Sequence, residues 1–313
     1  MTFPPRVPGR LYLTEGGIET EILYKWGHEL PQFAMFTLLD DPVALEDMKG
    51  IWRRYLTVAD RHELVPLIQG TDYRASPDWG ELLGYSREGL AEMIHKNIAF
   101  LRELEAEFDF QESYVGGTIG PRGDAYGTGD EITAEAAEEY HSFQLQSLKD
   151  AGADHAWAMT FNNVPESVGV ARAAKAIGLP LAITMNVTSA GELRSGVPLR
   201  DAIAQIDAAA GEEIAFLGIN CAHPLEFQPA LVPGAWQERI RSIRPNASQT
   251  EKLALCKIGH LEDGDPEELG RQMADIVRRM PQIDILGGCC GTDERHLERM
   301  AIEVKAMRNM EPA

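Results

Sequence analysis

Three cysteines stand at the ends of two apolar, glycine-containing segments, where their thiols could bind one metal ion. Cys221 ends the run Phe216–Cys221. Cys289 and Cys290 stand near the end of the run Ile285–Gly291. If both runs are strands of one sheet whose ends lie about 10 Å apart, their side chains could bring sulfurs to the roughly 3.8 Å spacing of thiolates on a tetrahedral zinc. Adjacent strand residues point to opposite faces, so the two neighbouring cysteines could share an ion only where the surrounding glycines let the chain leave strand geometry.

Three thiolate ligands would favour a particular kind of zinc chemistry. Structural zinc sites are usually closed by four protein ligands, whereas catalytic sites keep one position open. A thiol entering that position would bind as a thiolate near neutral pH and would stay nucleophilic, which favours alkyl transfer to sulfur. The alternative is that these are ordinary buried cysteines, a residue type common in cores. We apply that interpretation to the fourth cysteine, Cys256, which stands alone.

The cysteines must be positioned by regular elements, and the chain alternates short β-rich runs with amphipathic helical runs. The predicted strands are Leu11–Gly17, Leu64–Tyr73, Ser113–Gly120, His155–Phe161, Leu181–Asn186, Ala215–Cys221, Leu253–Ile258 and Ile283–Cys290. The predicted helices are Pro42–Arg61, Ser86–Glu107, Thr133–Ala151, Pro165–Ile177, Leu199–Ala210, Glu226–Ile243, Pro266–Met280 and Asp293–Asn309. Eight strand–helix units in succession predict a single α/β domain over residues 1–313, a (β/α)₈ TIM barrel. Active sites of such barrels lie at the carboxyl ends of the strands, where all three metal-type cysteines fall.

Charge and hydropathy indicate small-molecule chemistry. The 313 residues include 29 Lys+Arg and 49 Asp+Glu, which gives a formal charge of −20. This charge repels phosphate backbones and anionic lipids, so nucleic acid and membrane surfaces are poor partners. The N-terminal residues lack the apolar core of a secretory signal, and no apolar run approaches the roughly 20 residues of a membrane span. We therefore expect a cytoplasmic protein.

Four motifs in these predicted elements resemble the zinc-dependent homocysteine S-methyltransferases, which include betaine–homocysteine methyltransferase and the homocysteine-binding module of cobalamin-dependent methionine synthase. The motifs are Glu15-Gly16-Gly17-Ile18-Glu19-Thr20-Glu21, Gly116-Gly117-Thr118-Ile119-Gly120-Pro121, Gly218-Ile219-Asn220-Cys221 and Gly287-Gly288-Cys289-Cys290-Gly291-Thr292. The resemblance implies that Cys221, Cys289 and Cys290 bind Zn²⁺. It also implies transfer of a methyl group from a small-molecule donor to a thiol acceptor, with homocysteine giving methionine. Betaine-type, sulfonium and corrinoid or folate methyl carriers are all candidate donors.

The resemblance also implies the substrate-binding residues. Gly16 and Gly17 would offer backbone N–H groups to the acceptor's carboxylate, beside Glu15, where the family usually has Asp. Asn220 belongs to the motif that ends in the first cysteine. Tyr73 would occupy the open zinc position before substrate arrives, or would simply close the pocket as an aromatic residue on the rim.

The sequence departs from the family where the acceptor's amino group would be recognised. Met159 stands where a Glu is common, and a thioether cannot pair with an ammonium group. The segment Cys256–His260, after the predicted seventh strand, replaces a Pro-Asn-Ser-Gly type segment. The acceptor is therefore homocysteine with a compensating acid such as Glu19, a different thiol without the α-amino group, or, in a non-catalytic zinc- or thiol-binding barrel, no methyl acceptor at all.

Two residues near the predicted seventh strand admit other chemistry. Lys257 could form a Schiff base as in barrel aldolases and related lyases, although a lysine on the rim is more often a solvated or anion-binding charge. His260 could act as an acid or base, but methyl transfer to a zinc-bound thiolate needs no general base.

Overall fold

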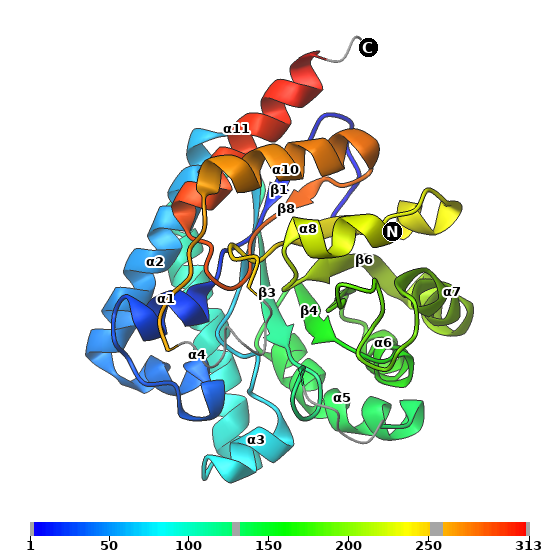
Figure 1. Ribbon diagram of the computed structural model, residues 1–313. Helices are drawn as coiled ribbons and strands as arrows, with labels where there is room; N and C mark the ends of the chain where they lie inside the picture. The colour runs from blue at the N-terminus through cyan, green and yellow to red at the C-terminus, as the bar shows by residue number, and fades with distance from the viewer. Residues whose placement is uncertain (1–2, 127–131, 251–258, 311–313) are drawn as a thin grey trace.

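Eight parallel strands form a closed barrel in the computed structural model, which describes residues 3–126, 132–250 and 259–310 (Figure 1). The strands are β1 Tyr12–Leu13, β2 Val65–Gln69, β3 Tyr114–Ile119, β4 His155–Phe161, β5 Leu181–Met185, β6 Ile214–Asn220, β7 Ile240–Arg244 and β8 Ile285–Leu286. Each strand pairs with the next in sequence, and β8 closes the barrel against β1. The predicted (β/α)₈ barrel is confirmed.

Helices surround the barrel in the order in which the strands occur (Figure 1). The main helices are α2 Pro42–Arg61, α4 Arg87–Glu105, α5 Ala134–Asp150, α6 Val164–Ile177, α7 Leu199–Ala210, α10 Pro266–Arg279 and α11 Glu294–Met310. Shorter helices are α1 Ile18–Tyr24, α3 Pro77–Leu82 and α8 Pro224–Phe227, with 3₁₀ turns at Pro31–Phe33, Met35–Asp40, Gly211–Glu213, Gln228–Ala230 and Ala235–Arg239. Side-chain caps set several starts: Asp41 accepts hydrogen bonds from Val43 and Ala44, and Ser86 accepts one from Gly89.

The sequence predicted two neighbouring elements wrongly, the seventh strand and the helix Glu226–Ile243 before it. Residues 226–243 instead contain the end of α8, two 3₁₀ turns and most of β7. Ile240–Arg244, all but the last of which were assigned to the end of that helix, form β7 between β6 and β8. The predicted strand Leu253–Ile258 lies outside the described residues. The error has a physical reason, because the two isoleucines of Ile240–Arg244 stand at the i, i+3 spacing of a helix, and two arginines are poor candidates for a buried strand.

Specific partners compensate the burial of the first of these arginines. The guanidinium group of Arg241 donates to both carboxylate oxygens of Asp284, at 2.9 and 2.6 Å, and to the Pro4 carbonyl at 2.8 Å. A buried charge is tolerated where it is paired and hydrogen-bonded in this way. A pattern of charges along the chain does not reveal that such a partner exists.

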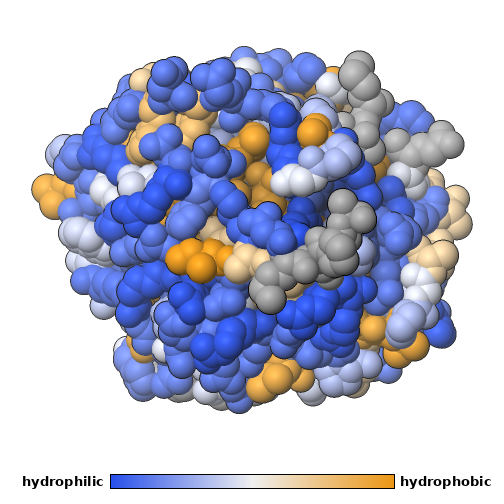
Figure 2. Space-filling view, turned by 90° about the horizontal axis from the view of Figure 1, so that it is seen from above, coloured by the Kyte–Doolittle hydropathy of each residue, from blue (hydrophilic) through white to orange (hydrophobic). Residues whose placement is uncertain are grey.

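The barrel interior is filled by side chains, so the strand ends form the floor of a site rather than a channel. The interior cluster consists of Tyr12, Leu67, Trp157, Met159, Ala182, Phe216 and Ile285. On the outside, the face in Figure 2 is mostly hydrophilic, with hydrophobic residues in separate small groups. Among the described residues, no helix combines the length and the apolar composition that crossing a membrane requires.

Asp72, just after β2, is a buried carboxyl group that should make stability fall as pH rises. One of its oxygens accepts a hydrogen bond from the Thr118 N–H at 2.9 Å, and the other has no hydrogen-bond partner among the described residues. Burial raises the pKa of Asp72 from 3.8 to about 7. Because the folded state keeps this proton to a higher pH than the unfolded chain, the stabilisation is complete below about pH 4 and is lost as pH rises through about 7.

We therefore expect Asp72→Asn to be more stable than the parent by about 2–4 kcal/mol at pH 8 but similar to it near pH 4. The free energy of unfolding in urea, measured at a series of pH values, tests this. A stability difference that stays constant across that range would contradict a protonated buried carboxyl.

Candidate metal and acceptor site

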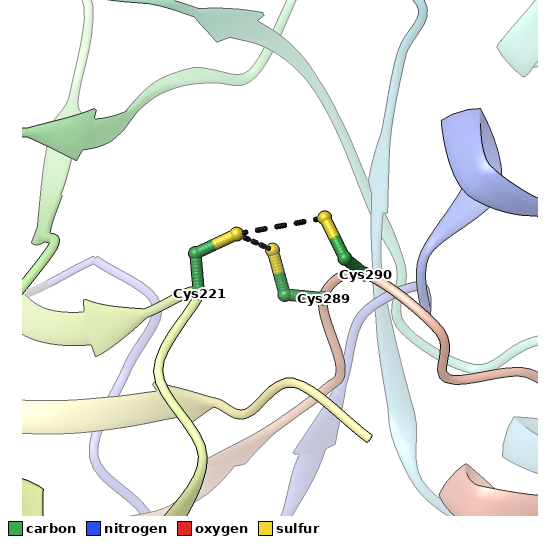
Figure 3. A group of neighbouring side chains, drawn as sticks. All are labelled: Cys221, Cys289 and Cys290. Carbon is green, nitrogen blue, oxygen red and sulfur yellow. Dashed lines mark hydrogen bonds between the residues drawn. The ribbon is translucent and has the colours of Figure 1, made fainter. Parts of the chain in front are cut away.

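The three cysteines predicted to bind metal converge at the carboxyl ends of β6 and β8, with all three sulfurs within 4.8 Å of one another (Figure 3). The Sγ atom of Cys221 lies 3.7 Å from that of Cys290 and 2.6 Å from that of Cys289. The first spacing matches the roughly 3.8 Å expected across a tetrahedral zinc, and the second must open by about 1 Å to share an ion. The second contact is also too long for a disulfide, whose sulfurs lie about 2.05 Å apart.

Backbone conformation at two strand ends holds the site in an unusual geometry. Cys221, just after β6, has φ +60°, and Thr160, near the end of β4, has φ +59°. Left-handed torsions are rare for residues other than glycine, and a β-branched threonine there is a genuine outlier. Such strained residues cluster at functional sites. A side-chain hydrogen bond joins the two strands, because Asn220 Oδ1 accepts the Thr160 N–H at 3.0 Å while its Nδ2 lies 4.0 Å from the Cys289 sulfur.

The electrostatics of the cluster fit a cation. Contact with the Cys221 thiol is the first cause that raises the pKa of Cys289 and that of Cys290, and burial and then charge repulsion raise it further. Three neighbouring thiols cannot all ionise unless a positive charge offsets them, and a metal ion supplies that charge. A sulfur-only donor set of this kind suits zinc or another thiophilic ion.

The segment after β7 supports both cysteine-bearing turns. The carbonyl of Pro245 accepts the Cys289 N–H at 2.8 Å, and Asn246 Nδ2 donates to the Cys221 carbonyl at 3.3 Å. The run Pro245-Asn246-Ala247-Ser248 thus stands where the family-type Pro-Asn-Ser-Gly segment was expected. The departure predicted at Cys256–His260 was an error of register that followed from misplacing the seventh strand.

The residues singled out near that misplaced strand do not join the site. Lys257 and Cys256 lie outside the described residues. His260 is exposed and pairs with Glu262 at 3.1 Å.

The glycine pair after β1 packs directly against the cysteine turn. A Cβ atom at Gly17 would lie 2.5 Å from the Cys289 carbonyl oxygen and 2.9 Å from the Gly291 nitrogen, and one at Gly16 would lie 2.7 Å from the Thr292 carbonyl oxygen. The Gly17 N–H donates to that Thr292 carbonyl at 2.9 Å, whereas the sequence predicted that it would bind the carboxylate of the thiol substrate. The geometry therefore supports a packing role for Gly17: the absence of a side chain lets the two backbones approach closely.

Glu15 lies beside these glycines, and its carboxylate is turned into the protein. One oxygen accepts the Gln69 N–H at 2.6 Å, and the other accepts the Thr14 hydroxyl. Burial raises the pKa of Glu15 to about 7 against the lowering effect of Arg244. The predicted acid is thus present at the site, but its carboxyl group is already hydrogen-bonded to Gln69, at the end of β2, and to the neighbouring Thr14.

Two tyrosines lie near the sulfurs, and the sequence identified only one of them. The Tyr73 hydroxyl hydrogen-bonds to the Thr160 hydroxyl rather than to a cysteine sulfur. Tyr126 instead donates its hydroxyl to the Cys221 sulfur at 3.0 Å. Arg194 fixes this second tyrosine by donating to its carbonyl oxygen at 2.7 and 3.1 Å. The sequence signal that could have indicated Tyr126 is the long segment that follows the predicted strand Ser113–Gly120, because loops after barrel strands lie on the active face.

A (β/α)₈ barrel with three converging thiols at the strand ends defines a class of barrel that can hold a thiolate-ligated metal at its active face. The sequence matches the model of the homocysteine S-methyltransferase family over residues 12–304. The chain belongs to this family and is a methyltransferase, which confirms the resemblance seen in its motifs.

Individual relatives are similar at low identity. The homocysteine S-methyltransferase of Escherichia coli K12 is 25% identical over 244 residues, covering 70% of this chain and 74% of the relative. Homocysteine S-methyltransferase YbgG of Bacillus subtilis is 24% identical over 254 residues, covering 72% and 76%.

Solved structures show the same fold. The oxidised form of the homocysteine methyltransferase MmuM from Escherichia coli has a TM-score of 0.74 at 20% identity, covering 93% of this chain and 95% of that chain. Its metallated form has a TM-score of 0.71 at 20% identity, covering 96% of each chain.

Proposed function

We propose that this protein transfers a methyl group from a small-molecule donor to a thiol acceptor that binds a zinc ion held by Cys221, Cys289 and Cys290. The observation that carries the proposal is the convergence of the three sulfurs within 4.8 Å at the active face. The family to which the chain belongs, homocysteine S-methyltransferase, makes homocysteine the first acceptor to test. A zinc ion bound there would supply Lewis acidity that favours the thiolate form of the acceptor.

The chain's own residues would orient the reactants. The acceptor thiol loses its proton to solvent on binding, and the sulfur lone pair then attacks the donor's methyl carbon. A carbon–sulfur bond forms while the bond between that carbon and the donor heteroatom breaks, and its electron pair leaves with the donor. Asn220 and Tyr126, which contact the cysteine sulfurs, would hold the ligand set in place. Tyr73 would shield one side of the site from water.

The decisive experiment is turnover. Zinc-loaded protein is incubated with homocysteine and, separately, with betaine-type, sulfonium and folate or corrinoid methyl donors, and methionine is measured. Methionine formation with one donor supports the proposal. Stoichiometric zinc binding without methylation of any thiol would instead support the alternative of a zinc- or thiol-binding barrel.

Binding of the acceptor should release a proton. A free thiol with a pKa of about 8.5 is largely protonated at neutral pH, so forming the thiolate at the metal must expel close to one proton. Titration calorimetry with homocysteine, in buffers of different ionisation enthalpy, should therefore give apparent binding enthalpies that vary with the buffer. Equal enthalpies in all buffers at saturating zinc would show that the thiol does not bind as a thiolate.

A further inference from the structure

Arg244 places a buried positive charge beside the metal-binding cysteines. It ends β7, next to Cys221, the residue after β6, and the Cys221 N–H donates to the Arg244 carbonyl at 3.0 Å. Its side chain is 5% exposed and reaches toward the other two cysteines, because Nε donates at 2.9 Å to the carbonyl of Gly288, the residue before Cys289. The guanidinium group therefore lies against the cysteine turn, over the ring of the buried Trp157 at 5.5 Å.

The guanidinium group makes no direct ion pair with a carboxylate among the described residues, although its charge acts on Glu15 and Glu19 from nearby. Nη2 donates to the backbone carbonyl of Glu15 at 3.1 Å, and Nη1 points at the Met159 sulfur at 3.3 Å. A thioether is a weak acceptor, and an arginine has five N–H donors, of which these contacts use three. Among the described residues, no carboxylate oxygen lies within 4.0 Å of it. A buried cation with unused donors is well suited to bind an anion.

The same arrangement opposes an ammonium group. By family resemblance, the acids at positions 15 and 159 would recognise the acceptor's α-amino group. Here position 159 is a methionine in contact with Arg244, and the Glu15 carboxylate is engaged by Gln69 and Thr14. An ammonium group placed between them would lie beside a guanidinium in a site of low dielectric, where like charges repel strongly.

We propose that Arg244 binds an anionic group of the acceptor, and that the preferred acceptor is a thiol carrying a carboxylate but no ammonium group next to it. The inference rests on the proposed function, since it assumes that a thiol binds at the three cysteines. It makes Arg244 a specificity-determining residue, with the planar guanidinium fork matched to a carboxylate.

Three thiols with the same spacing of three carbons between the sulfur and the charged group or groups test this on zinc-loaded, full-length protein. They are homocysteine, 4-mercaptobutyrate, which lacks the amino group, and 3-mercaptopropylamine, which lacks the carboxylate. We expect 4-mercaptobutyrate to bind at least about tenfold more tightly than homocysteine, and the amine to bind most weakly. Calorimetry without any methyl donor measures this directly, and zinc content and thermal unfolding are recorded for each protein.

Variants at position 244 separate binding from support of the fold. Arg244→Gln should weaken 4-mercaptobutyrate by about tenfold to a hundredfold while improving the amine, and Arg244→Lys should restore part of the loss. Equal weakening of all three thiols in both variants would show a structural clamp and overturn the inference. So would equal binding of homocysteine and 4-mercaptobutyrate to the parent.

Glu19 tests the opposite possibility, that an acid at the site binds the ammonium group of the acceptor. It is half-buried in the first turn of α1, where burial raises the pKa of its carboxyl group against the lowering effect of Arg244. If Glu19→Gln selectively weakens homocysteine while Arg244→Gln leaves the order of the three thiols unchanged, an acid recognises an ammonium group and the inference is wrong. Tight thiol binding without turnover would reject methyl transfer alone, whereas a parent that binds none of the three would reject both proposals.

Discussion

Replacing Cys290 with alanine should remove most of the zinc and nearly all methyltransferase activity, and Cys221→Ala and Cys289→Ala should do the same. We expect about one zinc per parent chain, held through a three-sulfur shell, because the three sulfurs lie within 4.8 Å of one another. Removing an outer-shell partner of a metal site typically costs about 10–100-fold in affinity, and the loss of a direct ligand should exceed that. Zinc content after dialysis against a weak chelator, with kcat/KM measured on the same samples, provides the test.

The fourth cysteine offers a control with the same chemistry. Cys256→Ala should retain zinc and activity, since our interpretation gives this thiol no metal role. Thermal unfolding separates loss of the ligand from loss of the fold. Full zinc occupancy in Cys290→Ala, with the protein folded, would remove that residue from the ligand set.

Adding one methyl group at Gly17 should lower kcat/KM by about a hundredfold. Its Cβ would lie 2.5 Å from the Cys289 carbonyl oxygen and 2.9 Å from the Gly291 nitrogen. Both are backbone atoms of the cysteine turn, so the start of α1 and the metal ligands must move apart. Overpacking of this kind costs about 1–3 kcal/mol of stability, and a displacement of about 1 Å at a reacting centre can cost a hundredfold in rate.

Gly50→Ala is the matched control, because a Cβ at Gly50, within α2, has nothing within 4 Å. Alanine there should leave activity unchanged and raise stability by about 0.5–1 kcal/mol, as expected for a helix interior. Parent-like zinc affinity and kcat/KM in Gly17→Ala would mean that the turn yields without cost and that close packing does not set the ligand geometry.

Much of the architecture follows from local pattern. The helices Pro42–Arg61 and Leu199–Ala210 have the predicted bounds, because a proline in the first turn or a sharp change of periodicity marks them. Alternation of eight strands and helices was sufficient to predict a closed barrel. The exception is β7, where Ile240–Arg244 appears too charged for a buried strand until Asp284 is found beside Arg241.

The three metal-type cysteines could be found by sequence alone because residue type, adjacent glycines and position at strand ends are all local properties. The tertiary structure, in contrast, decided which groups surround the thiol acceptor. Sequence could name Glu15 as a substrate contact, but not that Gln69 and Thr14 already engage its carboxylate. It did not show that Tyr126 would contact the Cys221 sulfur or that Arg244 would contact the Gly288 carbonyl, since each of these contacts joins segments far apart along the chain. Side-chain direction and the partners of buried charges depend on contacts between distant segments, and closure of the barrel determines which segments meet.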